Sequence, residues 1–71
     1  MSFQELWEQV SQLNSLPGSA IEQIPQVLSE YTKRRLLSKS PEYVAMIIRS
    51  TVSEIDHGSI ETVDTLVRKR L

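Results

Sequence analysis

Cysteine is absent from this chain of 71 residues. The sequence therefore excludes disulfides, a cysteine nucleophile, and zinc or iron–sulfur sites held by cysteine. A chain of this length buries only about 60% of the surface that it exposes when unfolded, so a monomer is marginally stable without another support. We expect self-association to supply that support, and we expect a reducing compartment, the cytoplasm, as the location.

Long apolar runs and glycines are also scarce. The longest apolar run covers residues 44–48, far short of the roughly 20 residues that a membrane span requires. The first ten residues lack the basic and apolar regions of an export signal, so we expect no contact with membranes. With 2 glycines, the chain has no glycine-rich loop of the kind that holds phosphate groups.

Helical periodicity is the strongest pattern that is present. Apolar side chains recur at intervals of three and four over residues 2–14, which predicts a helix with one apolar side. Ser2 and Glu5 have the spacing of a capping box, in which the serine accepts a hydrogen bond from an N–H of the first turn. Pro17 and Gly18 are expected to end this helix.

A second helix is expected over residues 19–37. Ser19 and Glu22 repeat the capping-box spacing at its start. Pro25 lacks a backbone N–H, so the sequence predicts either a kink there or a short helix followed by a new one with Pro25 in its first turn. An apolar stripe is expected to run through both parts and comprises Ile24, Val27, Leu28 and Tyr31.

Two further helices complete the prediction. Residues 41–57 have the longest apolar face, with Ser40 as the expected cap and Gly58 as the end. Residues 60–70 form the last helix, with Ser59 as its expected cap. No segment alternates with the period of two that is typical of a strand. We therefore predict a single all-α domain, a small bundle of four or five short helices without a β-sheet.

Residues with catalytic or metal-binding spacing are few. His57 lies close in sequence to Asp56 and Ser59, but the members of a catalytic triad usually come from distant segments. Glu54 and His57 have the E-x-x-H spacing of di-iron bundles, yet Glu54 lies at the edge of the apolar stripe and His57 on its polar side. We expect no catalytic, cofactor-binding or metal-binding residues and no enzymatic activity.

Charge is divided unevenly along the chain. Residues 1–32 contain four acidic side chains and no basic one, and the basic residues all follow. Nucleic-acid binding through this basic half is therefore the alternative function. In its helix-turn-helix form, residues 59–71 are the recognition helix, although the net charge of −1 and two acidic residues near the start of that helix weigh against it. The candidate contacts are Lys33, Arg34, Arg35, Lys39, Arg68, Lys69 and Arg70.

The favoured function is non-enzymatic binding of protein, most simply as a homodimer. Trp7 lies on the apolar stripe of the first helix, so it either packs in the core or anchors an interface. Arg34 and Arg35 stand where the second helix would continue its apolar stripe. Leu36 and Leu37 point away from that stripe, and we expect a bundle this small to leave some large apolar side chains uncovered. If the acidic first helix of one copy faces the basic segment of the other, Leu36→Glu should weaken the dimer more than salt does.

Overall fold

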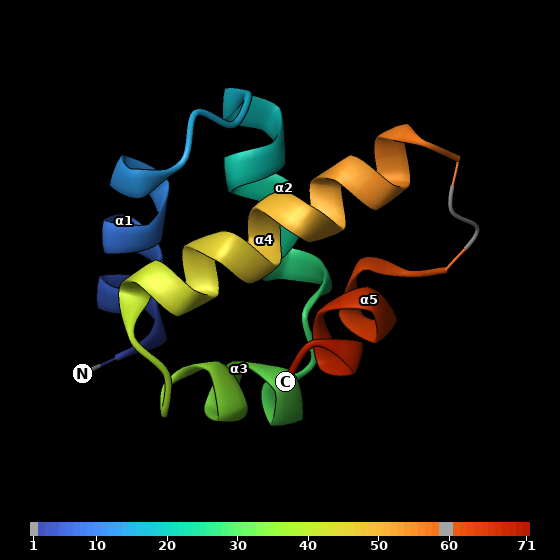
Figure 1. Ribbon diagram of the computed structural model, residues 1–71. Helices are drawn as coiled ribbons and strands as arrows, with labels where there is room; N and C mark the ends of the chain where they lie inside the picture. Colours follow the sequence, from blue (N-terminus) through green and yellow to red (C-terminus); the bar gives the residue numbers. More distant parts are fainter. Residues whose placement is uncertain (1, 59–60) are drawn as a thin grey trace.

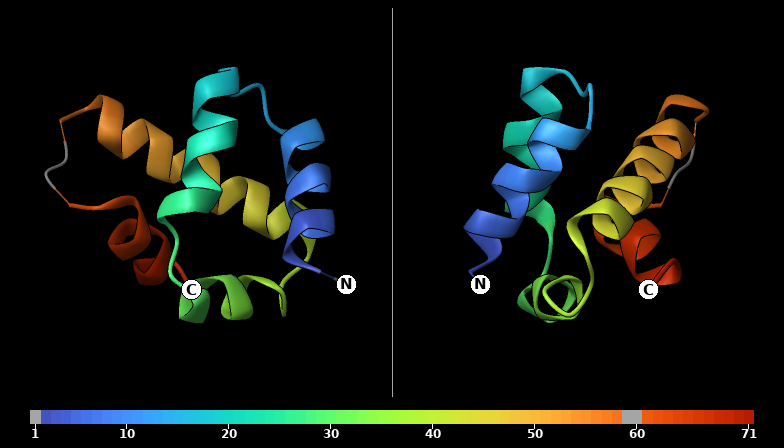
Figure 2. Two further views of the ribbon diagram at one scale, coloured as in Figure 1. Left: turned by 180° about the vertical axis from the view of Figure 1, so that it is seen from behind. Right: turned by 60° about the vertical axis from the view of Figure 1, so that its left-hand side comes forward.

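The computed structural model of the protein describes residues 2–58 and 61–71, and within them the chain forms five helices and no strand (Figure 1). The prediction of an all-α fold with four or five helices is confirmed. Figure 2 shows α1 and α2 on one side of the molecule, α4 and α5 on the other, and α3 beneath them. The helices are α1 (Phe3–Leu13), α2 (Gly18–Val27), α3 (Glu30–Leu36), α4 (Pro41–Asp56) and α5 (Val63–Lys69).

Two of the predicted helix starts are confirmed. Ser2 caps α1 by accepting a hydrogen bond from the Glu5 N–H, and its hydroxyl donates to the Glu5 carboxylate at 3.2 Å. Ser40 caps α4 by accepting from the Tyr43 N–H, and Pro41 occupies the first position, where the missing N–H costs nothing. These caps set the directions in which α1 and α4 begin.

The start of α2 differs from the prediction. The helix begins at Gly18 directly after Pro17, whose side chain has no atom that could cap it. Ser19 lies inside the helix, so the predicted capping box of Ser19 and Glu22 is wrong. Proline ends one segment and introduces the next here, because its fixed φ angle suits the residue before a helix.

The predicted break at Pro25 lies three residues further on. α2 continues through Pro25 and ends at Val27, and Leu28 then has extended backbone. Ser29 caps α3 by accepting from the Thr32 N–H at 3.2 Å. A serine that can cap a new helix therefore decides the position of the break, and the proline does not.

This break separates side chains that were expected to share one face. α2 and α3 run in different directions (Figure 1), so a stripe that is continuous in sequence does not form one surface. Ile24 and Leu28 are buried as expected, whereas Val27 and Tyr31 are exposed.

A hydrogen bond between α1 and α2 uses the carbonyl that Pro25 leaves without a helical partner. In a regular helix the N–H of residue 25 donates to the carbonyl of residue 21, but proline has no N–H. The indole Nε1–H of Trp7 instead donates to the Ile21 carbonyl at 2.9 Å. Trp7 also stacks on Phe3, with ring centroids 6.0 Å apart. A neighbouring helix thus satisfies an acceptor that α2 cannot satisfy itself.

α4 is the central helix of the core. Val44, Ile47 and Ile48 are fully buried, and the buried Thr51 hydroxyl donates to the Ile47 carbonyl at 2.9 Å. Gly58 follows the helix with a φ angle of 88°, a conformation that glycine adopts readily, so the predicted end at Gly58 is confirmed.

A polar connection fixes α1 along the first half of α4. The buried Asn14, at the end of α1, donates through its amide to the Ala45 carbonyl at 3.2 Å. Arg49, one turn further along α4, donates to the Asn14 side-chain oxygen at 3.2 Å. Every polar atom of this buried amide group is therefore held by α4, which fixes where α1 ends.

α5 is shorter than predicted. It begins at Val63, with Thr62 accepting from the Thr65 N–H at 3.2 Å, and not at residue 60. Ser59, the predicted cap, lies outside the described residues. Threonine is a good capping residue, and the sequence analysis overlooked it because it came after an apparently suitable serine. Within the described residues, no helix is both long enough and apolar enough to cross a membrane.

The paired roles of Trp7 and Pro25 give a prediction about stability. Trp7→Phe keeps an aromatic ring but removes the donor to the Ile21 carbonyl, and we expect a loss of about 1 to 2 kcal/mol. In Pro25→Ala, a new N–H can donate to that same carbonyl. The cost of Trp7→Phe should then fall by about 0.5 kcal/mol or more. Urea unfolding of the wild-type protein, the two single variants and the double variant measures these costs. An equal cost of Trp7→Phe with proline and with alanine at position 25 would contradict the pairing.

Candidate functional site

Two of the five residues predicted to form an interface lie in the core. Trp7 is 9% exposed and Leu36 is fully buried, so neither can supply the apolar contact of a dimer, and the interface prediction is wrong for these two residues. Leu37 is half-buried, and Arg34 and Arg35 are exposed. α3 lies beneath the other helices, and its inner side places Leu36 against them. Leu36→Glu would therefore unfold the protein, and it does not test self-association.

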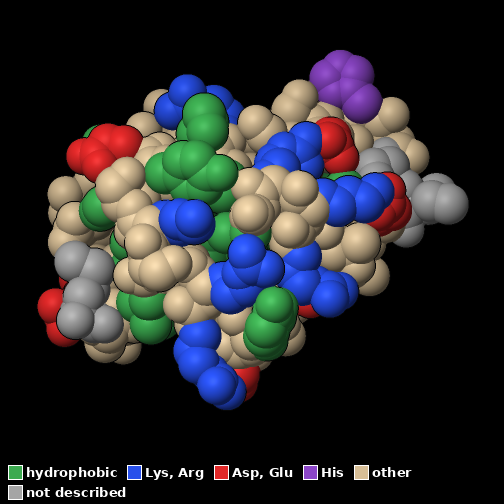
Figure 3. Space-filling model, turned by 60° about the horizontal axis from the view of Figure 1, so that its bottom comes forward, with side chains coloured by type: hydrophobic (Ala, Val, Ile, Leu, Met, Phe, Trp, Pro, Cys, Tyr) green, Lys and Arg blue, Asp and Glu red, His purple; other side chains and the backbone are tan. Residues whose placement is uncertain are grey.

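The predicted basic residues gather at one end of the molecule, although they come from two distant parts of the sequence. The Tyr43 hydroxyl, at the start of α4, donates to the Arg70 carbonyl at 3.0 Å and so holds the end of α5 close to the α3–α4 turn. Figure 3 shows Lys and Arg side chains distributed over this end of the molecule, with acidic side chains beside several of them. The fold therefore joins the two basic groups into one face.

Intramolecular ion pairs neutralise four of these basic side chains. Lys33 pairs with Glu30 at 3.7 Å on the same helix, and the others are on α5 or directly after it. They pair as Arg68 with Asp64 at 3.1 Å, Lys69 with Glu61 at 2.6 Å, and Arg70 with Glu54. Within residues 2–58 and 61–71, Arg34, Arg35 and Lys39 form no ion pair.

The geometry does not favour a helix-turn-helix in which α5 enters a DNA groove. A recognition helix presents the residues near its N-terminus to the bases. In α5, the Asp64 carboxylate near this end accepts a hydrogen bond from the Ser29 N–H at 2.9 Å, and Leu66 and Val67 are fully buried. The start of α5 is therefore committed to the rest of the bundle.

The histidine and the nearby acidic residues are separate surface features. His57 Nδ1 lies 2.7 Å from the Ser53 carbonyl, and Glu54 pairs with Arg70. In the part of the chain that the structure describes, no group of three or more histidine, aspartate and glutamate side chains could hold a metal ion. Ser59, the third member of the sequence cluster with Asp56 and His57, lies outside that part.

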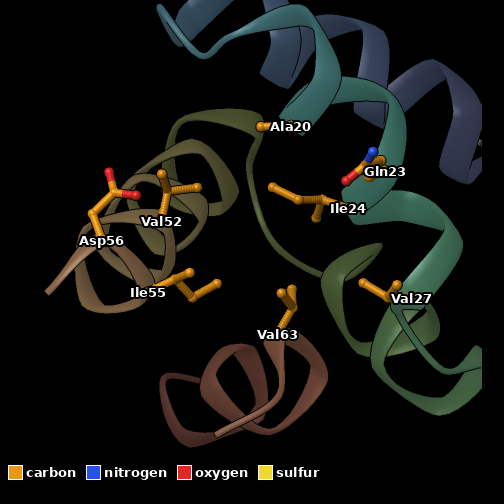
Figure 4. Close-up of a pocket in the computed structure, with 8 residues that line it drawn as sticks. All are labelled: Ala20, Gln23, Ile24, Val27, Val52, Ile55, Asp56 and Val63. Carbon is orange, nitrogen blue, oxygen red and sulfur yellow. The ribbon is translucent and has the colours of Figure 1, made fainter. Parts of the chain in front are cut away.

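An apolar groove between α2 and α4 is the feature that the sequence analysis missed. Figure 4 shows side chains of both helices facing one another, with Val63 of α5 at one end of the space between them. The groove has a volume of about 300 Å³ and is open to solvent. It is lined by Ala20, Gln23, Ile24, Val27, Val52, Ile55, Asp56 and Val63.

The two walls of the groove carry large apolar side chains that the fold leaves exposed. Val27 on α2 is 55% exposed and Ile55 on α4 is 39% exposed. Beneath them, Ile24 is buried and Val52 is half-buried, so the groove floor is continuous with the hydrophobic core. Water against such a surface is unfavourable, and covering it with apolar groups gains about 25 cal/mol for each Å².

Polar groups at the groove are few. Gln23 and Asp56 are the polar residues among those that line it. Asp56 is exposed and has no basic partner among the described residues. A site for a small substrate usually places several polar groups so that they converge on the ligand. This groove instead offers an apolar surface with one negative charge at its rim.

A hydrogen-bonded carboxylate holds α5 at the end of the groove. Burial acts to raise the pKa of the Asp64 carboxyl, but hydrogen bonds from the Ser29 N–H and from the hydroxyls of Thr32 and Ser29 act in the opposite direction. Together with the nearby Arg68 guanidinium, they lower the pKa of Asp64 below its ordinary value. The ionised Asp64 carboxylate thus holds the start of α5, next to Val63, at the α2–α3 junction.

Comparisons with known proteins add no assignment. No protein-family model matches the chain, and neither the curated proteins nor the solved structures gave a match. The functional argument therefore rests on the groove and on the basic face.

The lowered pKa of Asp64 predicts how stability depends on pH. A carboxyl with a lowered pKa in the fold stabilises the protein above its unfolded pKa of about 3.9, and this contribution disappears as the pH falls through the folded value. Asp64→Ala should cost about 1.5 kcal/mol at neutral pH. The difference from the wild-type protein should shrink below about pH 4. Urea unfolding at several pH values tests this, and a difference that stays constant into acid would contradict it.

Proposed function

We propose that this protein is a non-enzymatic protein-interaction module that accepts the apolar side of a partner's amphipathic helix in the groove between α2 and α4. The observation that carries the proposal is the pair of exposed apolar side chains, Val27 and Ile55, on opposite walls of one groove. Apolar side chains scattered singly over a surface are ordinary, whereas exposed apolar side chains gathered around one groove are typical of an interaction site.

The arrangement of the walls favours a helix as the occupant. Ala20, Ile24 and Val27 recur at intervals of four and three along α2, so they form one stripe about two turns long. Val52 and Ile55 form the facing stripe on α4. α2 and α4 cross at an angle (Figure 2), so the two stripes face each other across an open space. A partner helix can place apolar anchors spaced three, four and seven residues apart in this space.

The rim of the groove indicates the charge of the partner. Asp56 contributes a carboxylate that no basic side chain of the described residues neutralises. A lysine or arginine beside the partner's apolar stripe would meet this charge and set the register of docking, while the apolar contacts supply most of the affinity. The partner that fits is therefore a basic amphipathic helix. The cysteine-free sequence supports the reducing cytoplasm as the place where the two meet.

A synthetic helical peptide with leucines at positions i, i+3, i+4 and i+7 and lysines elsewhere tests the proposal by calorimetry. Ile55→Gln should weaken its binding about tenfold, because the variant removes apolar area worth about 1.5 kcal/mol. Met46→Gln is the matched control, since Met46 is also an exposed apolar residue of α4, at 53%, and does not line the groove.

Two further measurements identify the occupant. Replacing the peptide's lysines with glutamates should weaken binding to the wild-type protein, and this penalty should be smaller in Asp56→Asn. Equal losses of affinity in Ile55→Gln and Met46→Gln would contradict the proposal. Sedimentation of the protein alone tests self-association, and a dimer that Ile55→Gln dissociates would make a second copy the partner in place of a foreign helix.

A further inference from the structure

The basic face contains a part that the protein itself does not neutralise. Arg34 and Arg35 on α3 and Lys39 in the following turn are exposed, and no carboxylate of the described residues pairs with them. They follow one another at the end of α3, where the negative end of the helix dipole attracts cations but leaves their outer sides in water. Three exposed cations that lie close together in the sequence are thus available to a ligand.

Two tyrosine rings lie among these cations. Tyr31 is 58% exposed, and the Arg35 guanidinium lies 5.8 Å from the centre of its ring, with Nη1 donating to the hydroxyl at 3.3 Å. The Lys39 ammonium lies 5.6 Å from the centre of the Tyr43 ring. Each ring therefore has a positive group beside it, and Tyr31 keeps more than half of its surface in solvent.

The backbone that carries these side chains is held firmly. Thr32 and Leu36, on the inner side of α3, are both fully buried. The turn after α3 is closed by hydrogen bonds from the Ser38 hydroxyl to the Arg35 carbonyl at 2.7 Å and from the Lys39 N–H to the Leu36 carbonyl at 3.0 Å. The surface therefore exists before a ligand arrives, which lowers the entropic cost of binding.

We propose that the surface formed by Tyr31, Arg34, Arg35, Lys39 and Tyr43 binds single-stranded nucleic acid. The three cations would contact successive phosphates, and the exposed Tyr31 ring would stack on a base. This surface lies at the α3 end of the molecule (Figure 3), whereas the groove for the partner helix lies at the second half of α4. Nucleic-acid binding would therefore be a second function at a separate site.

The tyrosines distinguish a single strand from other polyanions. In duplex DNA the bases are already stacked and cannot meet a side-chain ring, and α5 is too committed to the bundle to enter a groove. An acidic protein would pair with the cations but would make no use of the tyrosine rings. An aromatic ring in contact with a guanidinium suits a base attached to a phosphate, because one nucleotide then engages both groups.

Fluorescence anisotropy with a labelled oligothymidylate tests the inference at several salt concentrations. Three phosphate contacts predict a slope of about −2 for log K against log salt, since each contributes about −0.7 for a single strand. Arg35→Gln should reduce this slope by about 0.7. Arg49→Gln makes the same change of charge on α4, where Arg49 binds Asn14, and should leave the slope unchanged.

Tyr31→Ala separates base stacking from charge. It should weaken binding about tenfold with the salt slope unchanged, because it removes a ring and no cation. Three results would overturn the inference: a duplex that binds as tightly as the single strand, a polyglutamate peptide that binds as tightly as the oligothymidylate, or an affinity that Tyr31→Ala leaves unaltered. Circular dichroism of each variant confirms that the helices are intact, so a loss of binding reports on the surface.

Discussion

The hydrogen bond from the Trp7 indole to the Ile21 carbonyl joins α2 to α1. Pro25 leaves that carbonyl without its helical donor, and an acceptor without a partner is costly inside a protein. α2 therefore packs beside α1, which is itself fixed to the first half of α4 through Asn14. α1 does not extend along the second half of α4, and there the groove lies between α2 and α4.

Much of the fold follows from local signals in the sequence. Ser2 and Ser40 start helices as predicted, because a cap needs only a side-chain oxygen beside a periodic segment. The failures are also local. Ser29 and Thr62 start helices that the analysis placed elsewhere, since several serines and threonines compete as caps and tertiary contacts choose among them. The Ser29 N–H, for instance, is held by Asp64, 35 residues away.

The candidate sites were less predictable, for a physical reason. Val27 follows the buried Ile24 by three residues and Ile55 follows the buried Ile48 by seven, so each exposed residue lies on the same side of its helix as the buried one. Periodicity shows on which side of a helix a residue lies, but it does not show whether a neighbouring helix covers that residue. The basic residues are visible in the sequence, but only the fold shows which of them form ion pairs within the protein. Arg70, for instance, pairs with Glu54, 16 residues away, whereas Arg34 pairs with no carboxylate of the described residues.

The groove between α2 and α4 is the surface that we propose for binding a partner protein. Methyl-group NMR during a titration with the basic amphipathic peptide tests this proposal most directly, because the chain carries apolar methyls both inside and outside the groove. The account predicts that the resonances of Val27, Val52 and Ile55 shift and saturate together, while those of Leu13 and Met46, which are exposed elsewhere, stay in place. Shifts centred on Leu13 and Met46, with the groove methyls unchanged, would contradict it.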